Sequence, residues 1–230
     1  RIEGIEVKIS KSKAQKEVKS GAFIGWDDPR TWSIQSLRRR GIKKEAIREF
    51  VKEIGLNKQD IIVPIDTLFS LNRKIIDPSA NRFYFVEDPI GLTVKKTPEI
   101  KEVEIAIHPD KPQIKRRLNL GDKIFISKKD FDPNKGKEIR LLHLFNIQIP
   151  KTGKNANYTS NEIKDIPKIQ WVSEGIKVRI LMDNGKWIEG LGEKSIENLK
   201  IDDIIQFERF AFCRLDTIKD GVYEFWYSHK

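Results

Sequence analysis

The sequence is poor in cysteine, methionine and histidine. Its 230 residues include one cysteine, Cys213, one methionine and three histidines. A single cysteine excludes a disulfide within the chain and is typical of a reducing cytoplasm, where we expect the protein to reside. One cysteine and three scattered histidines do not form a zinc cluster of the usual spacing, so no metal site is predicted. Cys213 follows the apolar residues Phe210-Ala211-Phe212 and is predicted to pack in a core.

Long apolar runs are also lacking. No stretch approaches the length of a membrane-spanning helix, and no signal-peptide core is present, so no membrane partner is expected. The first residue is Arg1 rather than Met. This start predicts that the chain is a piece of a longer protein.

Charge of both signs is abundant, with a basic excess. The 44 Lys and Arg residues outnumber 34 Asp and Glu residues, giving a formal net charge of +10. Residues 1–60 alone hold 15 Lys and Arg against 9 Asp and Glu. Such a balance favours a polyanionic partner, bound through phosphate contacts and counterion release.

The first third of the sequence has helical periodicity. Residues 43–55 carry apolar side chains at three- and four-residue steps and end at Gly55, as an amphipathic helix does. A second helix is predicted over Ile65–Ile76, ended by Asp77-Pro78. A short helix is predicted over Trp32–Arg40, with Gly41 beyond its end.

The pattern changes to period two after about residue 81. Val103, Ile105 and Ile107 alternate with other residues as in a half-buried strand. Asn184-Gly185 predicts a type I′ hairpin turn, which needs two positive φ values. The polar segment 151–167 is predicted to be a long loop. Further strands are expected at Ile124–Ile126, Glu138–Leu144, Ile176–Leu181, Ile204–Leu215 and Gly221–Tyr227, and many short strands with regular turns favour a barrel or a sandwich.

Three motifs follow one another near the N-terminus. Lys8-Ile9-Ser10-Lys11-Ser12 precedes Gly25-Trp26-Asp27-Asp28-Pro29-Arg30, and Arg38-Arg39-Arg40-Gly41 comes next. The first resembles the KMSKS signature of class I aminoacyl-tRNA synthetases, with Ile9 in the methionine place. In this order the three motifs resemble the glutamyl/glutaminyl branch of that class, in its archaeal-type glutamyl form. Lysines on long stems are able to reach phosphates, and small hydroxyl residues add donors.

The resemblance implies a fold and its boundaries. The expected class is α+β, with an N-terminal helical segment followed by two antiparallel β-barrels of the ribosomal L25-like anticodon-binding architecture. Residues 1–24 would form the KMSKS-like loop and the end of the catalytic domain, and residues 25–81 a helical stem-contact segment. Residues 82–135 plus 205–230 would form the proximal barrel, and residues 136–204 the distal barrel.

The resemblance also implies an activity. The parent would be a ligase that attaches glutamate to tRNA with ATP and Mg²⁺. Its catalytic loop would contain Lys8, Ser10, Lys11 and Ser12, with Lys11 contacting ATP and stabilising the departing pyrophosphate. Nothing in the chain matches the HIGH motif or the nucleotide-binding Rossmann half. We therefore expect the chain alone to be inactive and to bind no ATP.

The resemblance implies tRNA as the partner: glutamate tRNA, with glutamine tRNA as a second candidate. No DNA partner is expected. By position, Arg82, Arg140, Gln206 and Arg209 match residues of glutaminyl relatives that contact anticodon nucleotides. Arg38, Arg39 and Arg40 are candidate phosphate contacts, and Lys58 and Gln59 are weaker candidates. The relatives carry a second arginine where this chain has Leu142, so the pocket for one base is expected to differ.

Structural roles compete with each of these assignments. Arg209 could form an ion pair with the adjacent Glu208, and Arg82 could interact with a helix C-terminus. Arg140 could be a solvated charge on the outer face of its strand. Three other functions also remain open: a stand-alone RNA-binding barrel, a portion of a glutaminyl-tRNA synthetase, and a protein-interaction barrel with a solvated basic face. The last predicts no salt-sensitive RNA affinity.

Overall fold

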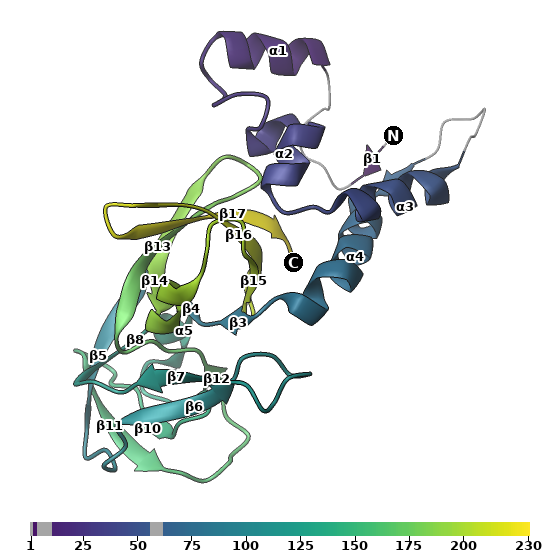
Figure 1. Ribbon diagram of the computed structural model, residues 1–230. Coiled ribbons are helices and arrows are strands. Elements are labelled where there is room, and N and C mark those ends of the chain that lie inside the picture. The colour runs from purple at the N-terminus through teal and green to yellow at the C-terminus, as the bar shows by residue number, and fades with distance from the viewer. Residues whose placement is uncertain (1, 4–10, 56–61) are drawn as a thin grey trace.

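The computed structural model of the chain describes residues 2–3, 11–55 and 62–230. Figure 1 shows helices at one end, a seven-stranded barrel-like sheet in the middle and a six-stranded barrel-like sheet at the other end. The two sheets agree with the expected barrels in number and in general form.

In the part of the chain that the structure describes, four α-helices precede the two barrel-like sheets: α1 (Lys11–Lys19), α2 (Ile34–Arg39), α3 (Lys44–Ile54) and α4 (Ile65–Ile76). Short 3-10 turns lie at Pro29–Thr31 and Asp77–Ser79. The helix expected over Ile65–Ile76 has these bounds. Helix α2 is shorter than predicted because Trp32 has a left-handed φ of 53°, and the Ser33 side chain caps the helix after it. Helices α3 and α4 pack through their apolar faces, with Ala46 and Phe50 against Ile65 and Leu68. Strand β1 (Ile2–Glu3) pairs in parallel with β2 (Val63–Pro64).

The seven-stranded sheet is closed by the covalent connection between its two edge strands. Its order is β3 (Arg82–Phe83), β15 (Ile204–Phe207), β16 (Ala211–Lys219), β17 (Val222–His229), β13 (Gly175–Leu181), β14 (Trp187–Glu193) and β4 (Phe85–Glu87). The edge strands β3 and β4 are consecutive in sequence, joined by Tyr84 alone. The two open edges therefore meet, as in a barrel.

The six-stranded sheet closes through a bridge. Its order is β12 (Lys168–Ile169), β9 (Glu138–Leu141), β10 (Asn146–Gln148), β11 (Asn155–Ser160), β5 (Pro89–Lys95) and β8 (Lys123–Ser127). Phe125 on β8 exchanges two backbone hydrogen bonds with Val172, which follows β12. Helix α5 (Lys128–Phe131) and 3-10 turns at Asp132–Asn134 and Lys194–Asn198 complete the fold.

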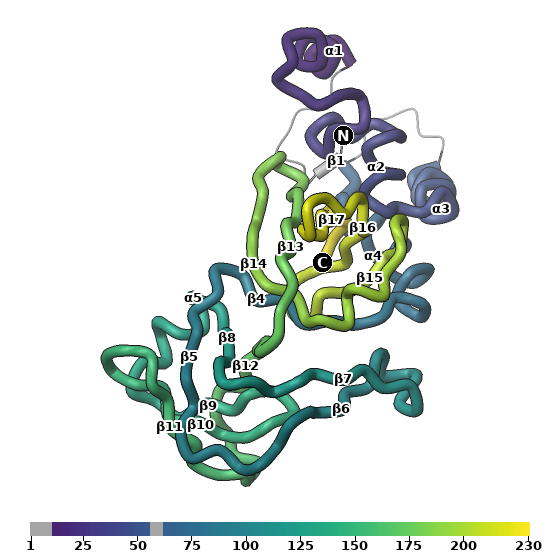
Figure 2. Tube along the Cα trace, turned by 60° about the vertical axis from the view of Figure 1, so that its left-hand side comes forward, coloured from purple at the N-terminus to yellow at the C-terminus, as the bar shows by residue number. Residues whose placement is uncertain are grey.

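A two-stranded ribbon forms a separate sheet and packs against the six-stranded core through Ile105 and Leu118. It consists of β6 (Glu102–Ala106) and β7 (Lys115–Asn119), paired antiparallel. Figure 2 shows the ribbon extending beneath the seven-stranded sheet.

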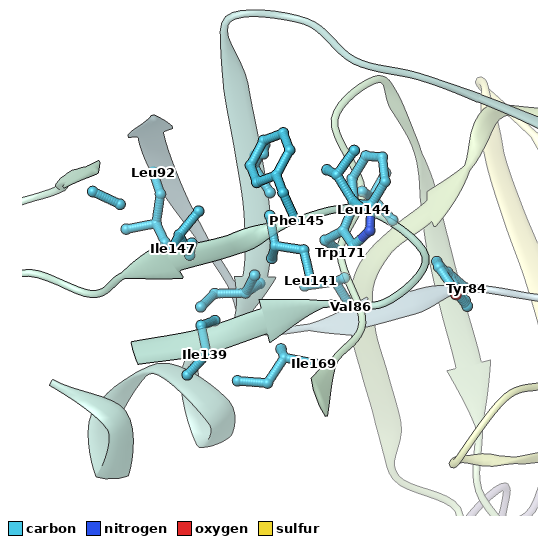
Figure 3. Packing of buried hydrophobic residues seen from close by; sticks show 14 of the residues in the cluster. Tyr84, Val86, Leu92, Ile139, Leu141, Leu144, Phe145, Ile147, Ile169 and Trp171 are labelled. Carbon is cyan, nitrogen blue, oxygen red and sulfur yellow. The ribbon is translucent and has the colours of Figure 1, made fainter. Parts of the chain in front are cut away.

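The two barrels share a wall formed by residues 83–86. Phe83 and Phe85 belong to the core of the seven-stranded sheet, whereas Tyr84 and Val86 belong to the core of the six-stranded sheet. This alternation follows from the period of two along an extended chain. Figure 3 shows the six-stranded core, in which Trp171 is fully buried. Cys213 is buried in the other core, as predicted, and its burial raises the pKa of its thiol.

The strand pairing corrects the expected boundaries between the barrels. Strands β13 and β14, within 136–204, pair with β17 and β4 of the seven-stranded sheet. Strands β5 and β8, within 82–135, belong instead to the six-stranded sheet. The sheets are also mixed rather than antiparallel, since β13–β17, β15–β3, β11–β5 and β12–β9 pair in parallel. Between β3 and β15 the chain crosses to the other barrel and returns, whereas the partners of the other three parallel pairs are separated by no strand of the other barrel.

Three local predictions were also wrong. The segment 151–167 contains strand β11 (Asn155–Ser160). One face of this strand is exposed, which accounts for its polar sequence, whereas Ala156 on the other face is buried. The strand expected over Ile204–Leu215 is two strands, separated by a turn at Arg209 with φ 59°. The hairpin at Asn184-Gly185 exists, but only Gly185 has a positive φ, so it is not type I′.

Candidate nucleic-acid interface

Arg82 and Gln206 are brought together by the sheet. They are register partners on the parallel strands β3 and β15. The Arg82 Nη2 atom lies 3.5 Å from Oδ1 of Asp77, just beyond the end of α4. Among the described residues, Nε of Arg82 is buried without a hydrogen-bond partner, and no hydrogen bond of the Gln206 side chain is found. The Arg82 side chain as a whole is 26% exposed, and no hydrogen bond of its Nη1 atom is found in the same residues. Nη1 of Arg82 and the amide of Gln206, rather than the buried Nε, are therefore the groups able to contact a ligand.

Arg209 occupies the turn between β15 and β16. Its guanidinium donates a hydrogen bond to the backbone carbonyl of Lys168, which connects the two barrels. The adjacent Glu208 pairs with Arg116, at 2.8 Å, rather than with Arg209. Arg209 also lines a cavity of about 180 Å³ together with Gln170 and Phe210.

Arg140 is held by protein groups. Its Nη1 atom donates to Oδ1 of Asn146 at 2.9 Å and to the carbonyls of Asn161 and Glu162, and Nη2 donates to the carbonyl of Leu144. Arg140 is thus half-buried and stabilises the backbone around Leu144 and Asn161-Glu162, so it is not a freely solvated charge. It is also the register partner of Lys168 on β12.

The four residues predicted to contact the anticodon form a connected strip. Arg82 is the register partner of Gln206, which lies three residues before Arg209. Arg209 donates a hydrogen bond to the carbonyl of Lys168, and Lys168 is the register partner of Arg140. The strip crosses from the seven-stranded to the six-stranded sheet. No local sequence pattern indicates this proximity, because it arises from pairing between distant strands.

Leu142 and His143 lie beside the strip. Leu142 packs its half-buried side chain against the six-stranded core. His143, which the sequence analysis missed, is exposed at the next position, with a left-handed φ of 58°. Partial desolvation lowers its pKa, while the charge of Glu208 opposes this shift. The only sequence signal is the residue type, since histidine is enriched among the non-glycine residues that adopt a left-handed φ.

The three consecutive arginines have three different environments. Arg38 is exposed, and no ion pair to it is found among the described residues. It lines a groove of about 850 Å³ with Trp26, Lys43 and Lys44, among other residues. Arg38 therefore retains the properties expected of a phosphate contact.

Arg39 is committed to protein contacts. It donates to both carboxylate oxygens of Asp216, at 3.0 and 2.7 Å, and stacks over Trp226 at 4.1 Å. Burial opposes ionisation of Asp216, but hydrogen bonds from Arg39 and Arg214 lower the pKa of this carboxyl overall. This pairing attaches helix α2 to strand β16.

Arg40 is fully buried, which corrects its assignment as a phosphate contact. Its guanidinium donates to the carbonyls of Tyr227 and Ser228, at 3.0 and 2.7 Å, and lies 4.6 Å from the ring centre of Trp32. Desolvation lowers its pKa to about 10, against the opposing charge of Asp183. Arg40 therefore fastens the helical segment to the last strand.

The N-terminal motif is described only in part. Lys11 and Ser12 are exposed in the first turn of helix α1, not in a loop. Lys8 and Ser10, as well as Lys58 and Gln59, lie outside the described residues. In the ranges described, no group of three or more His, Cys, Asp or Glu side chains is suited to hold a metal ion. No helix there is long and apolar enough to cross a membrane.

Comparison with known proteins gives matches along nearly the whole chain. Residues 2–78 match the catalytic domain of class I tRNA synthetases (E and Q), and residues 80–165 and 168–216 match two models of their anti-codon binding domain. The glutamate–tRNA ligase of Pyrococcus furiosus is 42% identical over all of this chain, which covers 42% of that protein.

Two further relatives agree. The glutamate–tRNA ligase of Methanococcoides burtonii is 38% identical over 97% of the chain, which covers 40% of it. That of Methanocaldococcus jannaschii is 36% identical over 98% of the chain, which covers 42% of it. The chain thus spans about two fifths of the length of the curated relatives it matches. It belongs to the glutamate and glutamine (E and Q) branch of the class I aminoacyl-tRNA synthetases.

Proposed function

We propose that this chain is the tRNA-binding and anticodon-recognition portion of a glutamate–tRNA ligase, which attaches glutamate to tRNA with ATP. The observation that carries the proposal is the register pair Arg82–Gln206, two partly exposed side chains with polar groups that make no described hydrogen bond, near the exposed Arg209. The anti-codon binding domain models that match this part of the chain support it.

The chemistry of the strip suits the reading of unstacked bases. A guanidinium presents donors in a rigid fork, and a glutamine amide presents both a donor and an acceptor. Single-stranded RNA is recognised through such contacts to the Watson–Crick edges of splayed bases. Arg82, Gln206 and Arg209 would contact a base directly, whereas Arg140 would both shape the neighbouring loop and contact a second base.

The helical part would contact the tRNA backbone. Arg38 and the nearby Lys43 and Lys44 line one groove, and compact or forked cations there would neutralise phosphates without reading sequence. Residues 25–81 would thus serve as the stem-contact segment. Lys58 and Gln59, outside the described residues, would extend this surface.

Residues 1–24, which precede the stem-contact segment, would take part in the reaction with ATP. Lys11 and Ser12 are exposed at the start of α1, so the lysine is able to reach a phosphate, as Lys8 and Ser10 would from the preceding residues. In the complete ligase Lys11 would stabilise the pyrophosphate as it departs. ATP–pyrophosphate exchange by this chain alone would contradict our proposal that it lacks the amino-acid-activating half.

Binding to three tRNAs across a salt series tests the proposal. We expect tight binding to glutamate tRNA, loss of binding to an unrelated tRNA, and an affinity that falls steeply with salt because several phosphates are contacted. Glutamine tRNA tests the effect of Leu142, since comparable affinity for both would indicate relaxed reading of one base. Equal affinity for all three tRNAs would refute anticodon recognition by this chain. Affinity that does not respond to salt would refute a tRNA-binding surface altogether.

A further inference from the structure

Arg116 on strand β7 is almost completely buried. Its Nε atom lies 3.0 Å from Oε1 of Glu193, and its Nη2 atom lies 2.8 Å from Oε1 of Glu208. The guanidinium also lies 5.1 Å from the ring centre of Tyr84, in the wall shared by the barrels. One side chain of the β6–β7 ribbon thus contacts two carboxylates of the seven-stranded sheet.

One of these carboxylates belongs to the turn that contains Arg209. Glu208 immediately precedes Arg209 and follows β15, the strand of Gln206. Its backbone N–H donates to the carbonyl of Phe83 at 3.0 Å, and its carbonyl accepts from Nε2 of Gln170 at 2.7 Å. The turn is therefore held from the ribbon, from β3 and from the six-stranded barrel.

The ribbon has a second attachment besides Glu208. The pair with Glu193, buried on both sides, already attaches the ribbon to the sheet. The Glu208 side chain is more exposed, at 24%, and Glu208 directly precedes Arg209 in the chain. Arg209 has a left-handed φ of 59°, a conformation that is unfavourable for a residue with a side chain and persists where the surroundings enforce it.

We propose that Arg116 and Glu208 are positioning residues for anticodon discrimination: their ion pair fixes the Glu208-Arg209 turn so that the Arg209 guanidinium is presented to the base. This inference rests on the proposed function. A guanidinium reads a base only when its fork is aligned with the base edge, so a loose turn costs selectivity more than general affinity.

Glu208→Gln tests the inference without disturbing the buried pair. The amide keeps the shape of the side chain, removes its charge and leaves Arg116 paired with Glu193. The measurement is the ratio of dissociation constants for glutamate tRNA and for the same tRNA with one anticodon base changed. We expect this ratio to fall about tenfold, within the range of one lost base contact. The matched control, Glu104→Gln on the exposed face of the ribbon, keeps the wild-type ratio.

A double mutant separates positioning from general loosening. If Glu208 acts through Arg209, Glu208→Gln lowers the ratio no further in an Arg209→Ala background. Additive losses, or an unchanged ratio in Glu208→Gln, would overturn the inference while the proposed function stands. Equal binding of both tRNAs by the wild-type chain would overturn the proposed function, and this inference with it.

Discussion

The side-chain amide nitrogen of Asn72 lies 3.0 Å from Nε2 of His229, and both residues are fully buried. Oδ1 of Asn72 accepts from the backbone N–H of Lys43 at 2.8 Å, which leaves the amide nitrogen as the donor toward the ring. Nε2 must then be an acceptor, so the ring is neutral. The contact joins helix α4 to strand β17, at the junction between the helices and the barrel.

This geometry predicts a pH-dependent stability. Burial lowers the pKa of His229 below its ordinary value of 6.5, with Arg40 and Arg73 adding to the shift and the Lys230 carbonyl opposing it. The unfolded chain therefore binds a proton more readily than the folded one. The stabilising contribution is complete above about pH 6.5 and is lost as the pH falls from there through the folded-state pKa.

Urea unfolding between pH 8 and pH 5 measures this effect. The wild-type free energy of unfolding falls across this range, and His229→Gln, which retains an acceptor for Asn72, shows a smaller fall. His143→Gln measures the separate contribution of that histidine, because desolvation lowers its pKa as well. A decline of equal size in His229→Gln and wild type would show that His229 is not the titrating group.

Arg40 and Arg38 make a matched pair for a second prediction. Arg40→Met removes the guanidinium that donates to the carbonyls of Tyr227 and Ser228 and lies over Trp32. We expect a loss of about 2–4 kcal/mol in unfolding free energy, as for a broken buried hydrogen-bond network. Arg38→Met, on the exposed face of the same segment, changes stability by less than about 0.5 kcal/mol. Comparable unfolding midpoints for the two variants would contradict the structural role of Arg40.

Gly190 makes the close contact that brings β14 onto β4. A Cβ added there would lie 2.2 Å from the carbonyl oxygen of Val86, a backbone atom that is unable to move aside. Gly190→Ala is expected to cost more than about 2 kcal/mol, in the range for overpacking. Glu189→Ala, at a neighbouring exposed position, is expected to have little effect. Wild-type thermal stability in Gly190→Ala would argue against this closure of the sheet.

Local features of the fold were predictable from the sequence, whereas strand partners were not. Helix α4 was predicted with its bounds, because its apolar period and the following Asp77-Pro78 are both local. Strand β13 was also found within one residue, but its parallel partner β17 was not anticipated. A period of two identifies a strand and its buried face without specifying its neighbour.

The arginine triplet shows the same limit at the site. Three identical residues in a row carry no signal that Arg40 is buried, Arg39 paired and Arg38 free of a described ion pair. The burial and pairing of these arginines depend on Trp32, Asp216 and strand β17, which contact them only in the folded chain. The likeness to a family predicts one function for Arg82 and Gln206, and the sheet register brings the two residues together.

That register yields the last prediction, on coupling between Arg82 and Gln206. The two residues are register partners, and we propose that both contact one base. Arg82→Ala and Gln206→Ala should then each reduce discrimination between anticodon variants by about 1–3 kcal/mol. The double mutant should lose little more than either single mutant, because contacts to one base are not independent. Arg38→Ala provides the contrast: it should weaken all tRNAs alike and reduce the salt slope by about 1. Binding constants for a set of single-base anticodon variants, measured at two salt concentrations, give both quantities. Additive losses would place Arg82 and Gln206 on different nucleotides, and equal losses on every variant would make them backbone contacts.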